Sequence, residues 1–323
     1  MQVSSKKITD LFFKMLWIRE VENMISNEYS NQEMRCPVHL SIGQEAIAVG
    51  VCANLKKNDQ ILSAHRSHAH YLAKGGSLDG MIGELYGKKI GCAHGKGGSM
   101  HLIDLDVGMI AAVPIVGSTL PIAAGASWAN KLKGNNKITC VFFGEGATEE
   151  GVFQESLDFA SLHNLKILFV CENNFFSVYS HLSKRQSKDR KITALSRSLG
   201  VKSEKNFGND ISTTYLKTKK AINYINQYNK PYLLEFETYR HLEHCGPNFD
   251  DNLNYRNKNE IDYWLKNCPI QLSTKYLINK KILSKKNIDI KKNSLIKIIK
   301  KSFLKAKKSP FPKKTDFMKD IYA

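Results

Sequence analysis

The sequence predicts an α/β fold in which a doubly wound parallel sheet is flanked by helices on both faces. Short apolar runs without polar alternation occur through the middle of the chain, as expected for strands that are buried on both sides. Stretches with helical periodicity separate these runs, which is the pattern of βαβ units. The length of 323 residues allows a large core without disulfides or a structural metal.

The predicted strands are the runs at 61–62, 138–143, 165–171 and 232–236. Residues 1–60 and 257–323 are expected to be mainly helical. Residues 179–207 are polar and rich in lysine and arginine, so an exposed loop is expected there.

The sequence contains no internal repeat and no linker rich in serine, glycine or proline. We therefore expect one domain over residues 1–323, with a core of about 36–256. A helical amino-terminal arm is expected at 1–35, and a helical, lysine-rich carboxyl-terminal region at 257–323.

The net charge of +18 is concentrated near the carboxyl terminus, where residues 275–323 hold 16 lysines, no arginine and three acids. These lysines are mixed with isoleucine, leucine and asparagine, which favours solvated helix faces over a nucleic-acid site. The seven cysteines include no Cys-x-x-Cys pair, so a zinc knuckle is not indicated. No apolar run approaches the roughly 18–20 residues that span a bilayer, and the start lacks a secretory pattern, so no membrane association and a cytoplasmic location are expected.

The segment 137–176 carries the most chemical information. Its first predicted strand is followed by Gly144-Glu145-Gly146, and Thr148 is expected to cap a helix with two acidic residues in its first turn. The second predicted strand ends in Asn173-Asn174. A right-handed crossover would bring Glu145 and Asn174 together at the carboxyl ends of two parallel strands.

A carboxylate, an amide oxygen and nearby glycine amides suit a magnesium ion that bridges a diphosphate. Amides at the start of the following helix are expected to face the phosphate. The alternative is a tight turn without any ligand, because Gly-x-Gly alone is a weak signal. A nicotinamide dinucleotide fingerprint does not fit, because Glu149 stands where its third glycine is needed.

The order Gly144-Glu145-Gly146 and then Asn173-Asn174 resembles the Gly-Asp-Gly and Asn-Asn signature of thiamine-diphosphate enzymes. The wider sequence resembles the alpha subunits of pyruvate dehydrogenase and its relatives. Motifs that match in order are HLSIGQEA at 39–46, AHRSH at 64–68, GKGGSMH at 95–101, IVG at 115–117, FGEGAT at 143–148, CENN at 171–174, TYR at 238–240, YR at 255–256 and the end of the chain from 309 to 323. The resemblance covers most of the chain and implies the thiamine-diphosphate-binding fold.

The resemblance also implies roles for individual residues. Glu145, Asn174 and the backbone carbonyl of Phe176 would hold the metal, and Arg66 would pair with the cofactor diphosphate, as suits a guanidinium. His39 and His244 match histidines that face the reacting end of the cofactor and are the candidate catalytic residues. The full set of candidate cofactor-binding residues is His65, Arg66, Pro114, Val116, Gly144, Glu145, Gly146, Ala147, Asn174, Phe176 and His244.

Three features depart from the family pattern. Glu145 replaces the usual aspartate and adds one methylene, although magnesium requires near-ideal ligand geometry. His65 stands where a tyrosine is usual. In the loop His241–Pro247, Cys245 replaces a regulated serine, so phosphorylation of that serine cannot occur in this chain.

The implied activity is that of an oxidoreductase: oxidative decarboxylation of a 2-oxo acid, with pyruvate as the default substrate and acyl transfer to a lipoyl disulfide. Branched 2-oxo acids and acetoin come next as substrates. The implied cofactors are thiamine diphosphate and Mg²⁺. The implied partners are a beta subunit in an α2β2 assembly, which supplies the glutamate that activates the cofactor, and a lipoyl-bearing acyltransferase. Two alternatives stay open: a non-lipoyl thiamine enzyme of transketolase-like or acyl-transferring type, and a basic nucleic-acid-binding protein on an inactive enzyme fold.

Overall fold

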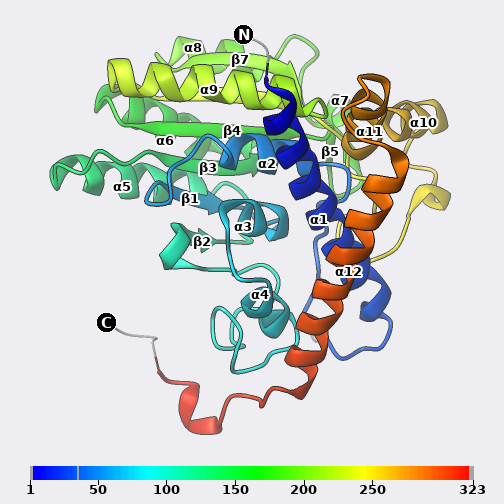
Figure 1. Ribbon diagram of the computed structural model, residues 1–323. Coiled ribbons are helices and arrows are strands. Elements are labelled where there is room, and N and C mark those ends of the chain that lie inside the picture. Colours follow the sequence, from blue (N-terminus) through cyan, green and yellow to red (C-terminus); the bar gives the residue numbers. More distant parts are fainter. Residues whose placement is uncertain (1–2, 35, 320–323) are drawn as a thin grey trace.

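The computed structural model describes residues 3–34 and 36–319 (Figure 1). The end of the carboxyl-terminal motif, Tyr322-Ala323, lies outside these residues. The strands are β1 (Gln60–Ser63), β2 (Met109–Ala112), β3 (Thr139–Gly144), β4 (Ile167–Asn173), β5 (Phe176–Ser177), β6 (Ser180–His181), β7 (Lys202–Phe207) and β8 (Tyr232–Glu237). The helices are α1 (Ser5–Tyr29), α2 (Glu45–Cys52), α3 (His68–Lys74), α4 (Leu78–Leu85), α5 (Thr119–Leu132), α6 (Gly151–Leu162), α7 (Leu182–Arg185), α8 (Ile192–Ser198), α9 (Ile211–Tyr228), α10 (Lys258–Lys266), α11 (Pro269–Asn279) and α12 (Lys285–Lys308).

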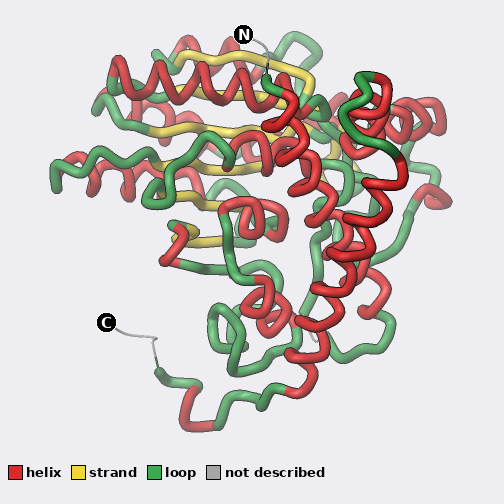
Figure 2. The backbone as a smooth tube through the Cα atoms, viewed as in Figure 1, coloured by secondary structure: helices red, strands yellow, loops and turns green. Residues whose placement is uncertain are grey.

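Six strands form one sheet in the order β2-β1-β3-β4-β8-β7, and every neighbouring pair is parallel. Helices lie on both sides of this sheet (Figure 2), which confirms the predicted fold class. All six residues of β3 except Gly144, and all seven of β4, are buried, as expected for central strands covered on both faces. From β1 the chain first adds β2 on one side and then crosses to β3 on the other, so the winding direction reverses between β1 and β3.

Alternate residues of the central strands pack into two hydrophobic layers. Phe142 and Val170 belong to the layer that includes α1, α2, α9 and α12. Val141 and Phe169 belong to the opposite layer, which includes α5, α6 and α8. This alternation follows from the period-two geometry of strands and anchors the sheet between both helical layers.

The lysine-rich carboxyl-terminal region is folded against the rest of the chain. Helix α12 packs on α1 and α4, and its buried residues include Leu295, Ile299 and Phe303 (Figure 1). On its polar side, Lys292 pairs with Glu20 at 3.0 Å and Lys307 pairs with Glu28 at 2.7 Å. The helix is therefore amphipathic, and part of its positive charge faces acidic groups of the same chain.

Two expectations for local structure are wrong. Residues 179–207 are not one exposed loop, because they include α7, α8 and the edge strand β7, which pairs with β8 along its whole length. Thr148 does not cap α6; a 3₁₀ turn at Glu145–Glu149 comes first, and α6 starts after Glu150. The Thr148 hydroxyl instead donates to the backbone oxygen of Glu145 at 2.7 Å, which holds that turn closed.

Within the described residues, no helix combines the length and the apolar character that crossing a bilayer requires.

Candidate functional site

A cavity of about 70 Å³ lies where β1, β3 and β4 end. Ligands of open α/β sheets bind at the carboxyl ends of strands, where the winding direction reverses, and the cavity has this position between β1 and β3. Ten of the predicted site residues line it: His65, Arg66, Val116, Gly144, Glu145, Gly146, Ala147, Asn174, Phe176 and His244. Pro114 and His39 do not line this cavity, although His39 contacts His65 and His244.

Glu145 is placed at the cavity by the end of β3, and its side chain is 2% exposed. Gly144 is paired in register with Glu172 of β4, so the residues that follow both strands emerge side by side. Glu145 and Asn174 line the same cavity, and the predicted meeting of these two strand ends is therefore confirmed.

The Glu145 carboxylate is paired with a cation of the same chain. Oε1 of Glu145 lies 2.6 Å from Nη2 of Arg185, which follows β6 in the segment expected to be a loop. Nη1 of Arg185 pairs with Glu149. Burial raises the pKa of Glu145, and the Arg185 charge opposes this effect by favouring the ionised carboxylate.

Asn174 is held in one orientation by hydrogen bonds on both sides of its amide. Its Nδ2 donates to Oε1 of Gln44 at 3.1 Å, and its Oδ1 accepts from the backbone N–H of Phe176 at 3.2 Å. Phe175, between them, has a φ of 68°, which is unusual for a bulky residue. The chain therefore makes a tight turn that brings the amide of Asn174 and the backbone of Phe176 to the cavity wall.

Arg66 is buried and directed by backbone oxygens. Its Nη1 donates to the carbonyl of Leu40 at 2.6 Å, and its Nη2 donates to the carbonyl of His244 at 3.1 Å. Burial, with a contribution from Arg240, lowers the pKa of Arg66 to about 9, so the guanidinium remains charged at neutral pH. A fixed guanidinium on the wall of a small cavity is suited to binding an anionic group.

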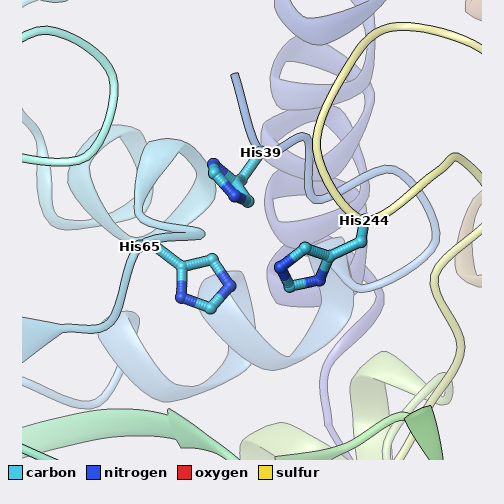
Figure 3. Close-up of side chains that lie close together, drawn as sticks. All are labelled: His39, His65 and His244. Carbon is cyan, nitrogen blue, oxygen red and sulfur yellow. The ribbon is translucent and has the colours of Figure 1, made fainter. Parts of the chain in front are cut away.

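Three histidines from separate loops form a cluster next to the cavity (Figure 3). The ring centroids of His39 and His65 are 4.6 Å apart, and each lies 5.2 Å from the ring centroid of His244. Burial, with the nearby charge of Arg66, lowers the pKa of His39 to about 2, of His65 to about 3 and of His244 to about 4. All three imidazoles are therefore neutral at physiological pH.

These pKa values predict a loss of stability as the pH falls. The unfolded chain takes up protons on these histidines near pH 6.5, whereas the folded chain does so only near their lowered pKa values. The stabilisation is thus complete above about pH 6.5 and is lost as the pH falls toward the folded-state pKa values, by up to about 1.4 kcal/mol per pH unit for one fully buried histidine. We expect His39→Gln to make the unfolding free energy less dependent on pH between about pH 7 and pH 5. Urea unfolding at several pH values measures this slope, and identical slopes for both proteins would contradict the expectation.

The structure also adds residues that the sequence did not suggest. Gln44 orients Asn174, and Arg185 pairs with Glu145. His70 lines the cavity and lies between Ser63, at 2.8 Å from Nδ1, and Glu172, at 3.2 Å from Nε2. Gln44 lies inside the matching motif at 39–46, so the sequence could have indicated it as a site residue. No local sequence pattern indicates Arg185, His70 or the partners of His70.

The donor set fits a hard divalent cation. Carboxylate, amide and backbone oxygens are the ligands that magnesium prefers, and Glu145, Asn174 and Phe176 offer one of each at the same cavity. An ion there would have to displace Arg185 from Glu145. Gly144 is also consistent with a bound ligand. Its φ of −79° suits any residue, and a Cβ added there would meet no atom within 4 Å. The position next to Glu145 therefore borders unfilled space that a side chain could have occupied.

Together, the parallel sheet and the cavity at its carboxyl edge, lined by Arg66, Glu145 and Asn174, define an α/β protein of the doubly wound class. Comparison with known proteins specifies the family. The model of the family described as "Dehydrogenase E1 component" matches residues 13–315. The chain therefore belongs to the dehydrogenase E1 component family, whose members are oxidoreductases, and this membership implies thiamine diphosphate as the cofactor.

Named relatives match over nearly the whole chain. The alpha subunit of acetoin:2,6-dichlorophenolindophenol oxidoreductase from Bacillus subtilis (strain 168) is 34% identical over 323 residues, which is 100% of this chain and 95% of the relative. The alpha subunit of the pyruvate dehydrogenase E1 component from Rickettsia felis is 30% identical over 311 residues, which is 96% of this chain and 94% of the relative. Both relatives are alpha subunits, so the predicted resemblance to this subunit type is confirmed.

Proposed function

We propose that the chain is the alpha subunit of a complex that oxidatively decarboxylates a 2-oxo acid, with pyruvate as the first candidate and a lipoyl group as acceptor. The observation that carries the proposal is the cavity at the carboxyl ends of β1, β3 and β4, which is lined by Arg66, Glu145 and Asn174. Arg66 is suited to binding a diphosphate, and the side chains of Glu145 and Asn174 are suited to ligating a divalent ion.

In the proposed site, Glu145, Asn174 and the carbonyl of Phe176 hold Mg²⁺, and Arg66 binds the diphosphate. Backbone atoms near Pro114, Val116, Gly146 and Ala147 position the rest of the cofactor. When bound, thiamine diphosphate supplies the nucleophilic carbon and the electron sink that decarboxylation requires.

The neutral imidazoles of His39 and His244 act at the reacting end of the cofactor. Nδ1 of His39 is buried and has no hydrogen-bond partner among the described residues, so it can exchange a proton with a substrate oxygen. Because the pKa of His39 is lowered to about 2, this group acts as a neutral donor or acceptor and not as a standing positive charge.

We further propose that a beta subunit completes the site and that the complex works in the cytoplasm. The cavity of about 70 Å³ has room for an ion and a few waters, so a larger cofactor must extend beyond it toward a covering chain. A relative named for pyruvate and a relative named for acetoin match with similar identity. Oxidative cleavage of acetoin is therefore the second candidate, and it uses the same cofactor groups.

The test is co-expression of this chain with the beta subunit, followed by assays with pyruvate, branched 2-oxo acids and acetoin, with and without a lipoyl domain. We expect turnover that requires thiamine diphosphate, Mg²⁺ and both subunits. Turnover by the isolated chain would overturn the shared-site proposal. Turnover that never depends on the lipoyl domain would favour the non-lipoyl alternative, and inactivity with all substrates together with salt-dependent retention on DNA would favour the nucleic-acid alternative.

A further inference from the structure

Residues 178–190 form a strap that lies against the turn Glu145–Glu149, which follows β3. The strap contains β6 and α7. Two of its side chains fasten it to the turn: Gln186 donates to the carboxylate of the last turn residue at 2.8 Å, and Arg190 donates to the hydroxyl of Thr148 at 3.0 Å. The strap is therefore tied to the segment that carries a proposed metal ligand.

Arg185, at the end of α7, reaches from the strap to the cavity carboxylate. Its Nη2 lies 2.6 Å from Oε1 of Glu145, and its Nη1 pairs with Glu149. Its Nε donates to the carbonyl of Ser180 at 3.1 Å. The side chain of Arg185 is 14% exposed and that of Glu145 is 2% exposed, so little water reaches this pair. A buried carboxylate without a partner is costly, and in this chain Arg185 provides the positive charge.

The Arg185 guanidinium also lies beside the glycine turn of the site. A Cβ added to Gly146 would lie 3.7 Å from Nη1 of Arg185. In the proposed function an ion on Glu145 also binds the cofactor diphosphate, so the diphosphate lies close to this guanidinium. A guanidinium can pair with a phosphate through two parallel hydrogen bonds. Arg185 is thus near both the metal-ligand carboxylate and the expected place of the diphosphate.

We propose that Arg185 couples the binding of the divalent ion to the binding of the diphosphate. Without the cofactor, the guanidinium stays on Glu145 and competes with an ion that arrives alone. When ion and diphosphate arrive together, the guanidinium leaves Glu145 for the diphosphate, and its bond to Glu149 keeps it beside the turn. Given the proposed function, on which this inference rests, Arg185 joins the residues that position the cofactor.

The charges of the site favour this coupling. Arg66 is buried on the cavity wall and Arg185 lies beside Glu145, so an ion that enters alone approaches two guanidinium groups. In the described part of the chain, the carboxylates that line the cavity are those of Glu145 and Glu172. A diphosphate adds negative charge that offsets both the ion and the guanidinium groups. The ion should therefore bind weakly before the diphosphate and strongly with it.

A clamp that only held the strap in place would need no contact with Glu145. Gln186 and Arg190 already fasten the strap through Glu149 and Thr148, and neither of these two residues lines the cavity. Among the described residues, the ion pair of Glu145 is with Arg185. Arg190 thus offers a control from the same strap with the same charge, because its removal disturbs the clamp without freeing Glu145.

Binding of Mn²⁺ to the complex with the beta subunit tests the proposal. Mn²⁺ takes the same oxygen ligands as Mg²⁺, and electron paramagnetic resonance measures its free concentration. In Arg185→Gln, Mn²⁺ without cofactor should bind about 10-fold more tightly than in the parent complex, because its competitor is gone. Thiamine diphosphate at saturating Mn²⁺ should bind about 10-fold more weakly, because a phosphate partner is lost. Loss of a mere clamp would not tighten ion binding.

Two further variants complete the test, and circular dichroism verifies that each variant is folded. Arg190→Gln should bind both ligands like the parent complex. Arg185→Lys keeps the positive charge and should bind Mn²⁺ alone as weakly as the parent, but it should bind thiamine diphosphate more weakly, because an ammonium group cannot form the paired bonds.

Unchanged or weaker binding of Mn²⁺ alone in Arg185→Gln would overturn the coupling, and so would tighter binding of Mn²⁺ alone in Arg190→Gln. These results would leave the proposed function in place, since the parent complex would still bind thiamine diphosphate with Mn²⁺. A parent complex that binds no thiamine diphosphate at any Mn²⁺ concentration would refute the proposed function and the coupling together.

Discussion

Replacing Glu145 with glutamine is expected to reduce thiamine-diphosphate-dependent turnover of the two-subunit complex by more than about 100-fold, because a direct metal ligand is lost. Glutamine keeps the size of the side chain and removes the charge that an ion requires. Arg185 keeps its second ion pair, with Glu149, in this variant, so its charge is not left without a partner and the fold should be retained. Mg²⁺-dependent cofactor binding, followed by calorimetry, should be lost in parallel with turnover.

Glu149→Gln is the matched control for this prediction. Glu149 also pairs with Arg185, but its side chain is 27% exposed, compared with 2% for Glu145, and it does not line the cavity. The control should retain cofactor binding and turnover. Glu145→Asp, which restores the shorter acid usual in the family, should retain both as well. Equal losses in Glu145→Gln and Glu149→Gln would indicate that the Arg185 ion pairs matter and would count against Glu145 as a metal ligand.

Phe169→Ala is expected to destabilise the folded chain by about 3–5 kcal/mol, because it leaves a cavity in the centre of the sheet. Phe169 lies in the middle of β4, is 0% exposed and packs in the layer formed with α5, α6 and α8. The same substitution at Phe249, which is 67% exposed, should change stability by less than about 0.5 kcal/mol. Urea unfolding of the three proteins measures the difference, and similar midpoints for both variants would refute the assigned burial of β4.

Much of the fold was predictable because its signals are local. The four predicted runs correspond to β1, β3, β4 and β8, since strands buried on both faces require nearly continuous apolar residues. The two edge strands of the sheet, β2 and β7, were not predicted. β7 reads Lys-Ser-Glu-Lys-Asn-Phe and has mostly exposed or half-buried residues, so it is held by backbone pairing with β8 and carries no hydrophobic pattern.

The sequence alone determined the sheet class, the meeting of Glu145 and Asn174 at two strand ends, and the family motifs that identify Arg66 and the candidate histidines. These follow from short-range patterns and from the fixed handedness of parallel crossovers. Only the tertiary structure decided the partners of these groups. The Arg185 pair with Glu145, the Gln44 bond to Asn174 and the three-histidine cluster each join segments that are 26 or more residues apart. Such contacts depend on how loops pack across the sheet edge, and packing at that range leaves no periodic trace in the sequence.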